Sequence, residues 1–540
     1  MDFLPAFDLG ADHTATLELP RFEDGCELVM IGRESSLKNS STVHPPDVKI
    51  AVNGRELGNF KTNFPHCFNG CSVHGARFVI SGAMLNLATN TVTFAVRDFD
   101  FLGRMVISRH PALARVTRLA LPLFAWMFLA SLAWWFAGSN RRWIFPVALV
   151  VTFFAGYHQS LATMKIAPFA DYFFSDPADF IKPIALGEYT FDVAKHPLFQ
   201  PVARPLYLLL KMLFSQPGAE PMAVMFSLVG AFNVFLAWRI FRRWFARPLA
   251  AAMLAVLYGF TFSVWTFSSH IETYIFSATA ANLFLLAMLG RDRLKKWAGI
   301  ALQVAAGSFA ALMNPPLLVL NAVSLVRMRR CSGKFAVLRE SLIAAAVLVI
   351  YMAGTRIIGH FSGAMNDSDS APKAVGGLVG SEAATFHHYA RSANLTLFQA
   401  GNILAGQCVH AIAGQTFPSH WSDGLRGIEH LWKHECLGAP AALAVAALWA
   451  AGLAGLALQR ERRRTSLELF ALVLLPYFLF FWAFNPGEMF LYSAPLVSLL
   501  LAWLGRGWEK IFAGARLEFF LLACGFFLLL HNAACLASYP

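Results

Sequence analysis

Long apolar runs recur along this 540-residue sequence and constrain its fold more than any other feature. A segment needs about 20 apolar residues to cross the hydrocarbon core of a bilayer as a helix, and several runs approach that length. The chain is 57% hydrophobic and only 14% charged, whereas a soluble protein of this size needs more charge on its surface. The pattern predicts a polytopic α-helical membrane protein with about 12 transmembrane helices. The predicted spans are residues 119–138, 143–160, 221–239, 248–265, 272–289, 298–312, 315–326, 337–357, 438–458, 467–484, 489–504 and 517–535.

The positive charge of the chain is concentrated in short loops between these runs. The net charge is +12, but short loops rich in Lys and Arg stay on the cytoplasmic side of a membrane. We therefore interpret the excess as a topology signal and expect no nucleic-acid partner. The long loops 161–220 and 358–437 then lie on the opposite, outer face. The predicted cytoplasmic loops are 140–142, 239–247, 290–297, 327–339, 459–466 and 505–516.

Residues 1–110 have a different pattern from the rest of the chain, which we treat as a transmembrane domain over 111–540. The alternating run 48–52 is followed by Asn53-Gly54, a pair that favours a β-hairpin turn, and a second alternating run covers 90–96. We expect an all-β sandwich of seven or eight strands. Its pattern is similar to that of carbohydrate-binding jelly rolls, and a structural or lid domain is an equal alternative. The loop topology places it on the outer face, although four arginines shortly before the first span favour the cytoplasm.

The first outer loop contains the residues best suited to chemistry. Its acids include Asp176 and Asp179, and it leads into an apolar stretch that is too short to span and carries Arg204 and Lys211. A carboxylate here could act as general base for an acceptor hydroxyl or amine. A cation could neutralise the phosphate of a lipid leaving group. The alternative is that the acids only solvate the loop or cap helices.

Two segments of the chain carry a resemblance to a known family. The first consists of DPADFIKPIALG at 176–187, HPL at 196–198 and RPLY at 204–207; it resembles the first-loop motif of GT-C glycosyltransferases, nearest to their protein O-mannosyltransferase-like branch. The second, FSVWTFSSHIETY at 262–274, is similar to the Trp and Glu-x-Tyr turn of the same proteins. The resemblance covers roughly residues 143–330.

This resemblance implies an inverting integral-membrane transferase that takes a sugar from a polyprenyl-phosphate donor. The family's first-loop acid is the catalytic base, which here is Asp176 or Asp179, and Arg204 and Lys211 would hold the donor phosphate. The family's His-Pro-Pro-Gly is His196-Pro-Leu-Phe in this chain, with a longer spacing to Pro-Leu-Tyr. We include His196 among the substrate-binding candidates, and the departures leave the substrate class open.

Further substrate-binding candidates lie in other outer turns. Glu272 either faces water at the end of a span or, as an ionisable group at membrane depth, faces a cavity together with His270 and Tyr274. Glu488 follows an Asn-Pro-Gly turn near an aromatic residue and is expected to line the same cavity. We interpret Asn314, which precedes two prolines, as a turn that ends a span rather than as a ligand.

The sequence gives no firm cofactor. The loop 358–437 is rich in His, and His430 and His434 have the i, i+4 spacing of a metal pair, but no carboxylate completes a site. We predict no metal site, and dependence on a divalent metal stays unknown. The absence of a Gly-rich phosphate loop argues against a nucleotide-driven pump.

Taken together, these features predict a glycosyltransferase of the bacterial cytoplasmic (inner) membrane. It would move a sugar from a polyprenyl-phosphate donor to a protein or glycan acceptor on the non-cytoplasmic face. One alternative is a transporter or flippase of a lipid-linked sugar, which should have broken helices near the bilayer midplane and internal repeats. Another is a non-catalytic polysaccharide-assembly protein. The acids collect in outer loops and no repeat is visible, which favours the transferase.

Overall fold

The structure is a computed structural model of the chain. The residues that it describes are 2–3, 7–8, 14–20, 26–34, 47–61, 73–80, 82–85, 87–96, 101–108, 111–136, 143–163, 184–185, 187, 196–213, 220–328, 334–361, 409–414, 435–484, 493–512 and 514–538.

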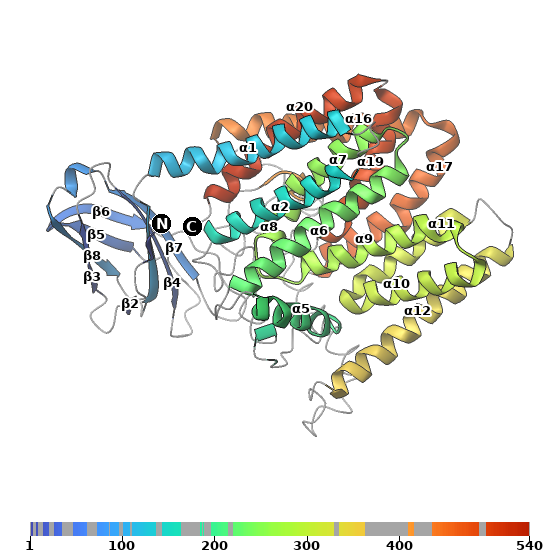
Figure 1. Ribbon diagram of the computed structural model, residues 1–540, viewed down its shortest axis with the longest axis horizontal. Coiled ribbons are helices and arrows are strands. Elements are labelled where there is room, and N and C mark those ends of the chain that lie inside the picture. Colours follow the sequence, from blue (N-terminus) through green and yellow to red (C-terminus); the bar gives the residue numbers. More distant parts are fainter. Residues whose placement is uncertain are drawn as a thin grey trace.

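The N-terminal part of the chain consists of antiparallel strands (Figure 1). The strands are β1 Asp2–Phe3, β2 Phe7–Asp8, β3 Thr14–Pro20, β4 Cys26–Glu34, β5 Asp47–Val52, β6 Arg55–Lys61, β7 Val73–Ile80, β8 Thr89–Val96 and β9 Phe101–Ser108. One sheet has the order β1-β9-β4-β7, with β2 also paired to β9, and the other has the order β3-β8-β5-β6. The packing of the two sheets into a sandwich stays a prediction.

The expected hairpin at Asn53-Gly54 is confirmed. β5 pairs with β6 so that Val52 lies opposite Arg55, and the two turn residues have φ values of 50° and 76°. Both values belong to the left-handed region that a tight hairpin turn requires. The Asn53 amide also donates to the Asn90 side-chain oxygen at 2.9 Å, while its own oxygen accepts from the backbone N–H of Thr91 at 2.8 Å. The turn is therefore fixed to the neighbouring strand β8.

The rest of the described chain is mostly helical. The α-helices are α1 Pro111–Phe136, α2 Ile144–Thr163, α5 Phe199–Leu213, α6 Glu220–Trp244, α7 Pro248–Phe260, α8 Phe262–Ser268, α9 Tyr274–Gly290, α10 Lys296–Met313, α11 Asn321–Met328, α12 Lys334–Phe361, α16 Glu435–Leu458, α17 Arg460–Leu469, α18 Leu475–Phe484, α19 Val497–Ile511 and α20 Ala515–Ser538. The 3-10 helices are η1 Gly82–Met84, η3 Arg291–Arg293, η4 Pro315–Leu320 and η8 Ala494–Leu496, and η6 Phe470–Leu474 is a π-helical turn.

Among the described residues, five helices are long and apolar enough to cross a membrane, and the number is six if α7 and α8 form one span bent by 59°. The five are Pro221–Trp244, Lys296–Met313, Val337–Ile358, Ala439–Leu458 and Ala515–Leu536. Each of the predicted spans overlaps a described helix, but the count of about 12 is not confirmed. The α12 window is only 11% buried inside the protein. A helix with apolar side chains exposed on most of its surface requires an apolar surrounding, which a bilayer supplies.

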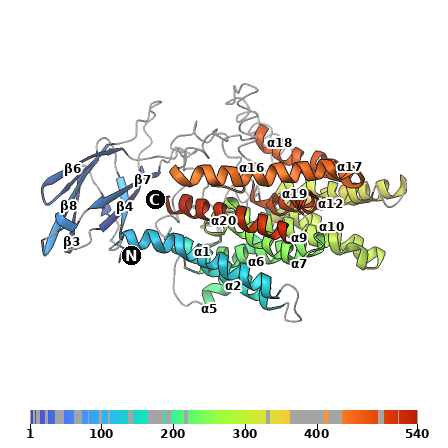
Figure 2. The ribbon, with the colours of Figure 1, turned by 90° about the horizontal axis from the view of Figure 1, so that it is seen from above.

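The helices form one bundle, and the strands lie at the end of the bundle where α1 begins and α20 ends (Figures 1 and 2). The core of the bundle is α6, which contacts α2, α7 and α9. The backbones of α16 and α19 approach closely where Gly452 faces Gly507. A Cβ atom at Gly507 would overlap the carbonyl group of Gly452. Small residues at such crossings are typical of packed membrane helices.

The basic loops meet at the other end of the bundle. Arg243 donates to the carbonyl of Leu286 at 3.0 Å, which joins the end of α6 to the end of α9. Gln459, between α16 and α17, donates to the carbonyl of Arg506 in α19. Arg247, between α6 and α7, donates to the carbonyl of Gly514 before α20. Four predicted cytoplasmic loops thus lie on one side of the described bundle.

Candidate functional site

The segments that carry the family resemblance meet at the end of the bundle away from the basic loops. α9 and α10 join at the basic turn η3, and α10 is 18 residues long. At 1.5 Å per residue this length places Met313 about 27 Å from that turn. Tyr274 begins α9, so it lies at the same far end. The site is therefore built where α8 turns into α9 and where α10 ends.

His196 links the first outer loop to the end of α10. Its Nδ1 lies 3.0 Å from the carbonyl oxygen of Met313, and its ring stands edge-on to Tyr274 with the ring centroids 6.4 Å apart. A carbonyl oxygen only accepts, so the contact requires a proton on Nδ1. Next in the chain, the N–H of Leu198 donates to the carbonyl of Leu312 at 3.1 Å. These contacts fix the start of α5 against α9 and α10.

The helix α5 is amphipathic and too short to span, as expected for the stretch that contains Arg204. It buries Phe199, Ala203, Tyr207 and Leu210 along one side. Other apolar side chains remain exposed, including Met212 at 75%. An amphipathic helix with exposed apolar residues is suited to the surface of a bilayer.

Arg204 lies against the end of the acidic loop. Gly187 has a φ of +81°, and a Cβ atom at this position would overlap the guanidinium group of Arg204. Gly187, which closes the DPADFIKPIALG motif, therefore contacts α5 directly. Lys211 is exposed and lies two turns further along α5, about 10 Å from Arg204 along the axis. The structure brings Arg204, but not Lys211, to the end of the acidic loop.

Glu272 and His270 lie in a buried turn between α8 and α9. Glu272 is only 2% exposed, so the reading in which it faces water at a span end does not hold. One of its oxygens accepts from the backbone N–H of Thr273 at 2.7 Å and from the Thr273 hydroxyl at 3.2 Å. Burial lowers the pKa of His270 to about 4, which keeps the ring neutral at pH 7.

Asn314 is a residue that sequence reasoning undervalued. α10 ends at Met313 and η4 begins at Pro315, so the expected turn is confirmed. The Asn314 side chain is 2% exposed, and its amide nitrogen has no hydrogen-bond partner among the described residues. A buried donor without a partner is costly, and such groups often mark the place of a ligand or a water molecule. A polar residue between two apolar segments was the sequence feature that could have indicated this.

A second feature that the sequence did not reveal is the break between α7 and α8. The N–H of Phe262 donates to the carbonyl of Ile412 at 3.1 Å, and the Ser263 hydroxyl donates to the carbonyl of Ala411 at 2.9 Å. The Asn532 amide of α20 donates to the carbonyls of Phe260 and Ile412, both at 2.8 Å. Residues 411–412 are thus inserted into the bundle, where together with Asn532 they satisfy backbone groups that the break exposes.

Other candidates lie outside the described residues. These are Asp176, Asp179 and Glu488, together with the His430–His434 pair. Within the described part of the chain, no group of three His, Cys, Asp or Glu side chains is placed to hold a metal ion.

Comparison with known proteins adds no family. Neither a protein-family model nor a curated protein matches this sequence. The class of the protein therefore follows from its structure: the described residues are mostly helical, with five or six helices able to span a membrane, and antiparallel strands precede them.

Proposed function

We propose that this chain is a GT-C-type glycosyltransferase that uses a polyprenyl-phosphate sugar. The observation that carries the proposal is the meeting of three segments at one end of the bundle. Gly187 contacts Arg204, and His196 contacts both Met313 and Tyr274. The end of the acidic loop, the amphipathic helix and the Glu272 turn are the parts that such a donor site needs, and the Glu272 turn is distant in the sequence from the other two.

In the proposed reaction the acceptor hydroxyl attacks C1 of the sugar. Asp176 or Asp179 takes the hydroxyl proton, the bond between C1 and the phosphate oxygen breaks, and polyprenyl phosphate leaves. Arg204 pairs with the phosphate, which gains charge as the bond breaks. Lys211, exposed on the same face of α5, attracts the donor to the membrane surface. The neutral His270 and the Glu272 turn shape the wall of the site, and Glu488 completes it.

The membrane arrangement is part of the same proposal. The chain would cross the bacterial cytoplasmic membrane about 12 times, with the basic loops inside. The site and the N-terminal strands then lie on the outer face, where a lipid-linked donor is available and cytosolic nucleotides are not. The gathering of the basic loops at the end opposite Tyr274 supports this orientation.

One observation favours the transporter alternative, because the bent pair α7–α8 is a broken helix of the kind that transporters use. However, the backbone groups at this break are bonded to residues 411–412 and to Asn532 rather than left to bind a substrate. A break filled in this way is a fixed structural feature. The transferase therefore remains the better-supported function.

The test is sugar transfer in membranes supplied with a radiolabelled polyprenyl-phosphate sugar. We expect Asp176→Asn or Asp179→Asn to reduce the rate at least 100-fold, the usual scale for a general base. Arg204→Gln should raise the KM for the donor, whereas Glu56→Gln, an exposed carboxylate on β6, should change nothing. Full activity in both Asp variants would refute the proposed base. Movement of the intact donor across vesicles without transfer would support the transporter instead.

A further inference from the structure

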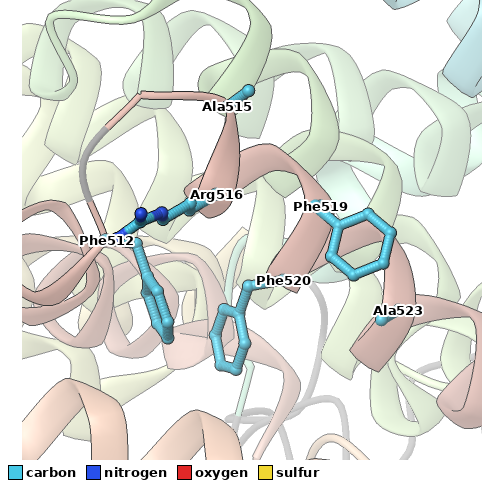
Figure 3. Close-up of a pocket in the computed structure, with 6 residues that line it drawn as sticks. All are labelled: Phe512, Ala515, Arg516, Phe519, Phe520 and Ala523. Carbon is cyan, nitrogen blue, oxygen red and sulfur yellow. The ribbon is translucent and has the colours of Figure 1, made fainter.

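A groove lies at the basic end of the bundle, where α19 ends and α20 begins (Figure 3). Its volume is about 540 Å³. The residues that line it are Phe512, Ala515, Arg516, Phe519, Phe520 and Ala523. The groove is far from the candidate donor site, because α20 begins beside the basic loop that contains Arg247.

The wall of the groove is mostly apolar. The rings of Phe512 and Phe520 stack with centroids 4.4 Å apart and an angle of 24° between their planes. Phe519 closes the other side (Figure 3) and is 72% exposed. The small side chains of Ala515 and Ala523 leave room between the rings. The groove runs along the first turns of a helix that is long and apolar enough to span a membrane. In a bilayer its open side would lie beside the acyl chains.

A single cation stands at the end of this apolar groove. Arg516 is exposed, and the ion pairs found among the described residues do not involve it. The nearby acid, Glu518, is 10% exposed at its side chain and lies 3.7 Å from Arg247. Glu518 is therefore engaged by another cation, and Arg516 keeps its charge available for an external anion.

We propose that this groove binds an anionic phospholipid of the inner leaflet. One acyl chain lies between the stacked pair and Phe519, and Arg516 binds the phosphate of the headgroup. An apolar channel with one cation at the membrane edge matches the two parts of such a lipid, and basic residues beside a span attract anionic lipids. The proposal rests on the chain lying in a bilayer with its basic loops inside, but not on its being a transferase.

The test uses the full-length protein in detergent, stripped of lipid and titrated with dioleoyl phosphatidylglycerol or dioleoyl phosphatidylcholine. Native mass spectrometry measures the affinity of the first bound lipid. We expect the anionic lipid to bind about fivefold more tightly, the scale of one surface cation. Arg516→Gln should abolish this preference. Lys510→Gln, which removes an exposed charge at the end of α19 outside the groove, should preserve it.

The apolar part of the groove has its own variant. Ala523→Phe adds a ring to the groove and should lower the affinity for both lipids by about the same factor. If Arg516→Gln and Lys510→Gln reduced the preference for the anionic lipid equally, the attraction would be due to general surface charge and the proposal would be overturned. Unchanged lipid binding in both groove variants would also overturn it, and a shift from dimer to monomer in them would identify a second copy of the chain as the occupant.

Discussion

The ion pair between Arg291 and Glu340 allows a quantitative prediction. One oxygen of Glu340 lies 2.8 Å from Arg291 and 3.1 Å from Arg339, while the other lies 3.0 Å from Arg291 and 3.1 Å from Gln303. The side chains of Arg291 and Glu340 are 9% and 0% exposed. Removal of one partner from such a pair leaves an uncompensated buried charge, which costs about 3–5 kcal/mol.

We therefore expect Glu340→Gln to lower the free energy of unfolding by about 3–5 kcal/mol, measured by titration with SDS. The double variant Arg291→Met with Glu340→Leu should lose less than the single variant, because no buried charge is left alone. Glu56→Gln serves as the matched control: it breaks an exposed pair with Lys49 at 3.6 Å and should cost less than about 1 kcal/mol. A loss below 1 kcal/mol in Glu340→Gln, or a larger loss in the double variant, would refute the reasoning.

Three further predictions concern backbone space and pH. Gly187→Ala should lower the free energy of unfolding by about 1–2 kcal/mol, because its backbone is in the left-handed region, and should also raise the donor KM by displacing Arg204. The control is Gly54→Ala, where φ is +76° and nothing lies within 4 Å of the new Cβ atom. This variant should show only the loss of stability in unfolding titrations. Gly507→Val should lower the free energy of unfolding by about 1–3 kcal/mol, because the new side chain would clash with α16. Gly156→Ala, which has free space around it in α2, should leave that free energy nearly unchanged. Equal losses in the two variants would contradict the close approach of α16 and α19. The pKa of His270 falls from 6.5 in the unfolded chain to about 4 in the folded one. The contribution of the neutral ring to the free energy of unfolding is therefore complete above pH 6.5 and is lost as the pH drops toward 4. The unfolding free energy of the native chain should decline over this window by about 3 kcal/mol relative to His270→Asn, and parallel curves would contradict the burial of a neutral ring.

Local features were predictable because their causes lie within a few residues. Asn53-Gly54 specified a hairpin turn, and apolar length specified where helices form. The predicted ends of a helix were wrong where the apolar run and the helix do not end at the same residue. The window 489–504 ends before the charged residues of α19, but the helix runs from Val497 to Ile511, since a charged last turn continues a helix as well as an apolar one does. The window 315–326 begins as a 3-10 helix because two prolines start it.

The partners of each segment could not be predicted, because they are distant in the chain. His196 and Met313 are separated by 117 residues, and Asn532 and Ile412 by 120. Hydrophobic periodicity indicates which face of a helix is buried but not which neighbour covers it. At the break between α7 and α8 the contacts come from residues 411–412 and from Asn532, which lie far along the chain from Phe260 and Phe262.

The filled break also bears on how the proposed site is held in place. α8 leads directly into the turn that contains His270 and Glu272, so any movement of α8 would move that turn. The hydrogen bonds from Phe262 and Ser263 to residues 411–412 fix the start of α8, and Ser269, directly after its end, donates to the carbonyl of Tyr157 at 3.3 Å. A transferase gains from such a rigid support because its reacting groups must keep a fixed geometry. A transporter whose cycle moved α8 would need to break these bonds, and this difference in required motion is the physical reason why we propose a transferase.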